Sequence, residues 1–373
     1  MTKDYINLKK TSDKDGEISF EAEIPLEALE AKMNEALVRE SADFSLPGFR
    51  KGKVPEHIVR QHISEMALLE DAAHNGLESA VREIITDEKL SIIGAPQATI
   101  TKIAPKNPVM FTVKFALYPS FELPDYRKIG KTIADRKEKS EASESDIDEA
   151  IARIQKMMAG QHEHVHAEGE ECNHNEKEKT KLPEITDEFV KQFGPFNSVT
   201  EFRVEVAKQL AQEKEMQIKD AKREEIVKKI MESAKIKLPQ LLVDEEYYDF
   251  IGRRDEELAK AEMSLDAYLK EVKKTEKEFE RDERKLIEDR IKISLVLGEI
   301  RKKEDIKTDE SEIRKFIPSL KMRYPNRTES DLRRTTEAYI VQEKLFDIFE
   351  GKEEEKKEAE NMEKLEEIVS EEE

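Results

Sequence analysis

The sequence has no tryptophan, one cysteine and few aromatic residues, and these shortages exclude whole classes of protein. A lone thiol at Cys172 rules out an intrachain disulfide, which excludes a small secreted domain held together by disulfides. No stretch approaches the run of uncharged apolar residues that a membrane span needs, and the first residues lack the apolar core of a signal peptide. We therefore expect a soluble, cytoplasmic protein without membrane contact.

Charge is what the chain has in abundance. Charged residues make up 40% of its 373 residues, and the formal net charge is -20. Apolar residues nevertheless recur with helix or strand periodicity along most of the length, which favours long solvated helices over disorder. Nucleic acid repels a uniformly acidic protein, so any contact with RNA would require a local basic patch.

The first 120 residues predict an α+β domain, a small antiparallel sheet with two long helices. Apolar and polar residues alternate over 17–24 and again over 109–117, which is typical of half-buried strands. Helical spacing follows Pro25 as far as residue 42 and returns over 55–84.

After residue 120 the sequence changes character. Residues 121–181 predict a linker with one short helix, for which Ser145 is the expected N-cap and Gly160 the expected end. Residues 182–350 predict an elongated all-α domain with helical arms, because apolar residues there keep helical spacing throughout. Residues 351–373 predict a charged tail.

The most informative segment joins the two predicted helices of the first domain. Residues 44–55 read FSLPGFRKGKVP, and their proline and glycines are typical of a tight loop at the end of a helical hairpin. Phe49 is expected at the exposed apex, with Arg50, Lys51 and Lys53 beside it. Such a tip can contact phosphate or an acidic protein surface. A solvated turn with incidental charges fits these residues about equally well.

The run GFRKGKVP at 48–55 resembles the ribosome-binding signature of bacterial trigger factor. Its surroundings agree, because 182–194 (LPEITDEFVKQFG) and 294–306 (SLVLGEIRKKEDI) resemble the C-terminal domain of that family. The resemblance extends over roughly residues 1–160 and 182–350.

This resemblance implies a ribosome-associated chaperone that needs no cofactor. In the family, the signature grips the large ribosomal subunit beside the exit tunnel, on a ribosomal protein and adjacent rRNA. By direct match the gripping residues would be Phe49, Arg50 and Lys51. Other residues would shape the loop: Gly48, Gly52, Lys53 and Pro55. The helical domain would shield apolar segments of unfolded nascent polypeptides and aid folding and export, and free copies could form a homodimer.

One departure from the family bears on activity. Trigger factors usually insert an FKBP-type peptidyl-prolyl isomerase domain with an aromatic-lined pocket between the first domain and the helical one. The corresponding interval here, about 145–181, has no aromatic residue and cannot build such a pocket. The sequence therefore predicts no isomerase activity. A folding enzyme like the full-length members stays the alternative.

The same interval gathers potential metal ligands: His162, His164, His166, Cys172 and His174. Imidazole and thiolate are chemically able ligands, but this spacing does not match the common structural zinc sites. We expect a polar linker without a metal site, and keep a metal-responsive helical adaptor as a further alternative.

Apolar stripes on the C-terminal helices are more often core than client-binding surface. The residues that we consider candidates for lining a client surface are Tyr247, Tyr248, Phe250 and Met263.

Overall fold

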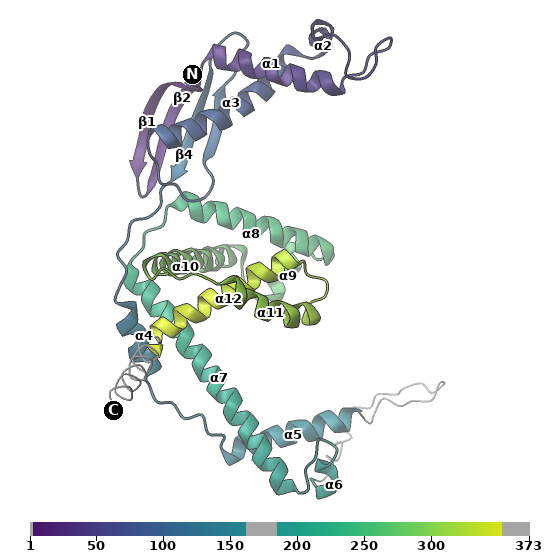
Figure 1. Ribbon diagram of the computed structural model, residues 1–373, viewed down its shortest axis with the longest axis vertical. Helices are drawn as coiled ribbons and strands as arrows, with labels where there is room; N and C mark the ends of the chain where they lie inside the picture. Colours follow the sequence, from purple (N-terminus) through teal and green to yellow (C-terminus); the bar gives the residue numbers. More distant parts are fainter. Residues whose placement is uncertain (1–2, 162–184, 353–373) are drawn as a thin grey trace, which may run out of the picture. The chain divides into compact units, whose positions relative to one another are not determined.

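The computed structural model describes residues 3–161 and 185–352, which group into two compact units (Figure 1). The first unit holds the chain up to Leu123 together with Ser233–Ile300. The second holds Pro124–Glu232 together with the chain from Arg301 on. Each unit thus combines segments that are far apart in the sequence, and the domain boundaries given above stay a prediction.

The first unit contains a four-stranded antiparallel sheet of order β1-β2-β4-β3. Its strands are β1 (Ile6–Lys14), β2 (Glu17–Ile24), β3 (Gln97–Lys102) and β4 (Val109–Ala116). Alternate side chains of β2 and β4 point to one face, where Phe20, Phe111 and Phe115 are fully buried. Helix α3 (Glu65–Asp87) packs on that face and closes the main core (Figure 1). The predicted sheet with helices is confirmed.

The long helix predicted over 55–84 is in fact two helices. Helix α1 (Leu26–Asp43) is followed by a loop, then by α2 (Glu56–His62) and α3. The break lies at Ile63, whose backbone is extended, with φ −99° and ψ 134°. The Ile63 side chain packs against the buried residues between α1 and α2, so a local tertiary contact replaces continuous helix.

The rest of the chain is largely helical, as predicted. The long helices are α7 (Val199–Ala234), α8 (Gln240–Lys260), α10 (Glu276–Lys303) and α12 (Glu329–Phe349), with shorter α9 (Leu265–Glu271) and α11 (Glu310–Arg323). A capping box precedes α10. The Thr275 amide donates to the Glu278 carboxylate at 3.0 Å, and the Glu278 amide donates to the Thr275 hydroxyl at 3.3 Å.

The predicted linker, residues 121–181, holds α4 (Tyr126–Ala134) and α5 (Glu144–Gln161), and α6 (Asp187–Val190) lies beyond its predicted end. Ser145 lies inside α5, and the cap is Ser143, whose hydroxyl accepts from the Asp146 amide at 3.2 Å. Helix α5 also continues through Gly160, so both predicted ends were wrong. Helices α5, α6 and α7 pack around a core that is partly aromatic: Ile147, Ile151, Phe189, Val190, Phe202 and Val206.

Crossing a bilayer demands a long apolar helix, and none occurs within the described ranges.

The sheet also contacts α8 within the first unit. Pro239, which precedes α8, offers no side-chain cap, and the Leu241 amide donates instead to the Glu17 carboxylate at 2.7 Å. Ala116, Leu241 and Leu242 form a small buried cluster beside this bond. The first strand hairpin thus caps a helix that begins more than two hundred residues later.

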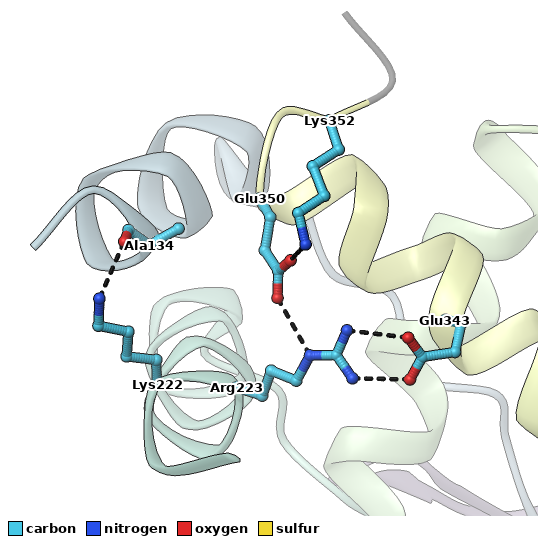
Figure 2. Close-up of polar contacts among 6 residues, drawn as sticks. All are labelled: Ala134, Lys222, Arg223, Glu343, Glu350 and Lys352. Atoms are coloured by element: carbon cyan, nitrogen blue, oxygen red, sulfur yellow. Dashed lines mark hydrogen bonds and ion pairs between the residues drawn. The ribbon is translucent and has the colours of Figure 1, made fainter. Parts of the chain in front are cut away.

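In the second unit, Arg223 joins α7 to α12 (Figure 2). Its guanidinium donates to both carboxylate oxygens of Glu343, at 2.6 and 3.0 Å, and to Glu350 at 3.0 Å. It also lies over the Phe346 ring, 4.3 Å from the centroid. Next to it the Lys222 ammonium donates to the Ala134 carbonyl at 3.0 Å, which brings α4 to the same junction.

These contacts change the acidity of both carboxyl groups. Hydrogen bonds from Arg223 hold the pKa of Glu343 below its ordinary value. At Glu350, burial by itself raises the pKa, but hydrogen bonds from Lys352 and Arg223 outweigh burial and lower it. Both groups are therefore carboxylates in the folded chain near neutral pH.

Replacing Arg223 by Ala leaves the partly shielded Glu343 carboxylate without its guanidinium partner and leaves Glu350 with Lys352 alone. We expect the free energy of unfolding of the second unit to fall by about 3 kcal/mol, near the lower end for removing one partner of a buried pair. Urea unfolding followed by circular dichroism measures it. The control is Arg281→Ala, because the Arg281 side chain is 75% exposed. A loss no larger than in the control would contradict the assigned role.

The contribution of this junction should also depend on pH. A carboxyl group with a lowered folded pKa stabilises the fold above its unfolded pKa, here about 4.5, and loses that contribution as pH falls through the folded pKa. The difference in unfolding free energy between the natural chain and Arg223→Ala should therefore be constant from about pH 7 to about pH 5.5, and shrink below that. Urea titrations across this range measure it. A difference that grows on acidification would show the wrong sign.

Candidate functional site: the tip of the α1–α2 hairpin

Residues 44–55, here called the hairpin tip, form a series of tight turns between α1 and α2. The Phe49 amide donates to the Leu46 carbonyl at 3.0 Å, and the Lys53 amide donates to the Arg50 carbonyl at 2.9 Å. A third bond, from the Gly52 amide to the Phe44 carbonyl at 3.0 Å, returns the chain to the end of α1. Backbone bonds thus fix the loop that carries the predicted site residues.

Two glycines allow this path. Gly48 has φ +95° and Gly52 has φ +71°, a region that side chains disfavour. A Cβ on Gly52 would also lie 2.6 Å from the Ala42 carbonyl oxygen, whereas one on Gly48 would meet nothing within 4 Å. Gly52 is therefore required both by backbone conformation and by the close approach of α1. Pro55 is the residue directly before α2.

A small core lies beneath the tip. Val54 is 5% exposed and packs with Leu37, Val59 and other buried residues of α1, α2 and α3. Phe44 and Leu46 pack partly against the same group. Phe49 does not join it and is 41% exposed. The apolar residues on either side of the apex are thus drawn inward while Phe49 stays at the surface.

The cations of the tip are all exposed. Lys51 pairs with Asp43 at 3.0 Å, but both side chains are mostly exposed, so this pair is weak and easily exchanged. Within residues 3–161 and 185–352, Arg50 and Lys53 form no ion pair. The structure brings together Phe49, Arg50 and Lys51, the three residues that sequence predicted as the contact set. Sequence reasoning missed the inward-facing Phe44, Leu46 and Val54, although their apolar character was visible.

The four residues considered as candidates for a client surface lie on or next to α8. Phe250 and Met263 line a cavity of about 540 Å³ between α8, α9 and α10, together with Tyr268, Arg253 and other residues. Tyr248 of α8 is 67% exposed and does not line this cavity. Tyr247 packs under the Arg284 guanidinium, 4.2 Å from the ring centroid. Phe250 and Met263 thus line a cavity and Tyr248 is exposed, whereas Tyr247 is covered by Arg284.

The histidine and cysteine candidates lie outside the described residues: His162, His164, His166, Cys172 and His174. In the part of the chain that the structure describes, no three His, Cys, Asp or Glu side chains gather in a way that could hold a metal ion.

Comparison with models of known protein families shows to which family the chain belongs. Residues 6–154 match the bacterial trigger factor protein family, and residues 198–356 match the C-terminus of the same family. The chain belongs to the trigger factor family. No FKBP-type domain is matched between residues 154 and 198, so this trigger factor is a variant without that domain, as the sequence predicted.

Individual trigger factors match over most of their length. The trigger factor of Corynebacterium aurimucosum is 24% identical over 381 residues, which cover 83% of this chain and 84% of that protein. That of Finegoldia magna is 24% identical over 372 residues, covering 79% and 83%. A solved structure from work on promiscuous substrate recognition in folding and assembly activities of the trigger factor chaperone matches with a TM-score of 0.51. It is 17% identical, with 93% of this chain and 99% of that one covered, and so is similar in fold.

The two glycines of the tip provide a matched pair of variants. Gly52→Ala should force the loop off α1, because its Cβ would lie 2.6 Å from a backbone oxygen. Gly48→Ala meets only the cost of the left-handed backbone, about 1 kcal/mol. We expect trypsin to cleave at Arg50, Lys51 and Lys53 several-fold faster in Gly52→Ala than in Gly48→Ala, measured by mass spectrometry of timed digests. Equal cleavage rates would contradict the packing described for Gly52.

Proposed function

We propose that this trigger factor docks on the large ribosomal subunit through the hairpin tip and shields apolar segments of newly made polypeptides with its helical region. The observation that carries the docking proposal is the exposure of Phe49 at an apex whose other apolar residues are packed beneath it. A large apolar ring held in water on a rigid support fits an anchor residue better than a core residue. The contact would be to a ribosomal protein and nearby rRNA in the cytoplasm.

The distribution of charge also supports docking through the hairpin tip. With a net charge of -20, most of the surface is repelled by RNA phosphates, so approach is favoured only where cations are concentrated. Arg50 and Lys53 are free to pair with an external anion, and Lys51 can exchange Asp43 for one. These cations would set the approach, while Phe49 supplies the apolar contact that holds the complex.

Shelter of clients is supported by the helical part of the first unit. The cavity beside Phe250 and Met263 is open to a side chain of an unfolded segment, and Tyr248 offers a separate exposed ring on α8. Methionine and exposed aromatic side chains adapt to varied partners, which suits weak binding of many clients. Aid to folding and export would follow from this shelter. A homodimer of free copies remains a prediction from the family resemblance.

Replacing Phe49, Arg50 and Lys51 together by Ala removes the anchor and two cations. We expect the affinity for large subunits in a cosedimentation assay to fall more than about tenfold. The salt dependence should also become shallower, by about 0.7–0.9 in the log–log slope for each cation that contacts a phosphate.

The matched control for this experiment is Ile6→Ala/Lys9→Ala/Lys10→Ala. It removes one exposed apolar side chain and two exposed cations from β1 in the same unit. The control should cosediment like the natural chain. Undiminished pelleting of the Phe49/Arg50/Lys51 variant would refute docking through the tip.

A further inference from the structure

A second concentration of positive charge lies at the end of α11 and in the loop that leads to α12. Residues 313–327, here called the α11 tip, contain five cations and no Asp or Glu: Arg314, Lys315, Lys321, Arg323 and Arg327. In the whole chain, acidic residues outnumber basic ones by 85 to 65. The α11 tip thus reverses the charge of the molecule locally, as the hairpin tip does.

Large apolar side chains are exposed among these cations. Met322 is 84% exposed, Tyr324 45% and Phe316 42%. Tyr339 of α12 is 51% exposed and stands edge-on to Phe316, with ring centroids 6.1 Å apart. This apolar surface therefore continues from α11 onto α12.

The surface rests on a firm support. Asp309 and Glu312 form a capping box at the start of α11, and Glu312 also pairs with Lys344 of α12 at 2.7 Å. Ile313 is buried between the helices. The Glu312–Lys344 pair and the buried Ile313 therefore hold the start of α11 on α12, and the exposed residues of the α11 tip follow them in the chain.

Most cations of the α11 tip are available to a partner. Arg314 is held by Glu310 at 3.2 Å. Arg323 lies over the Tyr324 ring, 5.7 Å from its centroid. Lys315, Lys321 and Arg327 make no ion pair in the described part of the chain.

The chemistry of this surface favours an acidic polypeptide. Arg, Tyr, Phe and Met are the residue types enriched where proteins bind one another, whereas a nucleic-acid surface would use its aromatic rings for stacking and gain little from an exposed Met. Its unpaired cations favour partners that bring carboxylates and disfavour basic ones. We propose that the α11 tip binds unfolded segments whose apolar residues are flanked by Asp or Glu.

This inference rests on the proposed function, because it names the class of client that one surface takes. Over most of the molecule, the net negative charge disfavours acidic clients. At the α11 tip, the carboxylates of an acidic client could pair with the cations, and its apolar residues could pack against Phe316, Met322 and Tyr324.

The test uses two short fluorescent peptides with identical apolar residues, flanked by Glu in one and by Lys in the other. Fluorescence anisotropy with the full chain should give about tenfold tighter binding of the Glu peptide, and the difference should shrink as salt is raised. The variant Lys321→Glu/Arg323→Glu/Arg327→Glu should lose or reverse this preference. The variant Met322→Ser/Tyr324→Ser should weaken binding of the Glu peptide several-fold.

The matched control is Lys208→Glu/Lys228→Glu/Lys229→Glu, which makes the same change in net charge with three exposed residues of α7. It should keep the preference for the Glu peptide. Equal binding of the two peptides by the natural chain, or loss of preference in the control as well, overturns the proposal.

Other occupants of the surface give distinct results, and each would overturn the proposal. Single-stranded RNA that displaces the Glu peptide at equal concentration would show a nucleic-acid site. Self-association lost in Lys321→Glu/Arg323→Glu/Arg327→Glu would show a contact between copies. A tenfold gain in peptide affinity when the glutamates of residues 353–373 are replaced by Gln would show that the chain's own tail occupies the surface.

Ribosome cosedimentation separates this inference from the proposed docking. The α11 variant should pellet with ribosomes like the natural chain, whereas the Phe49/Arg50/Lys51 variant should not. If docking fails its own test while the Glu peptide still prefers the α11 tip, the client inference stands without it.

Discussion

Phe49 remains in water because its neighbours are taken into a small core of their own. Val54 turns back between α1 and α2, Phe44 and Leu46 follow, and Gly52 lets the loop pass within contact of Ala42. That core is distinct from the one between the sheet and α3. The support of the tip thus comes from residues of α1, α2 and α3 next to the loop.

The hairpin tip and the α11 tip both present positive charge on an acidic chain, but they differ in the apolar residues that accompany it. An acidic chain repels nucleic acid over most of its surface, so it must concentrate positive charge wherever it meets an anionic partner. At the hairpin tip the cations surround a single ring on a tight loop. At the α11 tip they surround several apolar side chains on a helix and its loop. A compact anchor suits one defined dock, and a broader mixed surface suits varied segments.

Much of the fold was predictable because its signals are local. Alternation over β2 and β4, the cap at Thr275 and the glycine loop of the hairpin tip depend on neighbours within a few residues. What escaped prediction depends on distant partners. No residue near Ile63 in the sequence indicates the helix break that accompanies its packing. Likewise, no residue near Arg223 indicates that its partner is Glu343, 120 residues away. The sequence likewise placed Phe49 at an apex but could not show which residues would leave it exposed.

The bond between Glu17 and Leu241 has a consequence for synthesis. The two residues are 224 positions apart, and the intervening chain includes α4 to α7 of the other unit. The strand hairpin therefore leaves the exit tunnel long before the helix whose first turn it caps. Until Leu241 has been synthesised, the Glu17 carboxylate lacks this hydrogen bond and the apolar surface near Ala116 lacks its contacts with α8. The first unit of this trigger factor is therefore completed only after most of the polypeptide has been made.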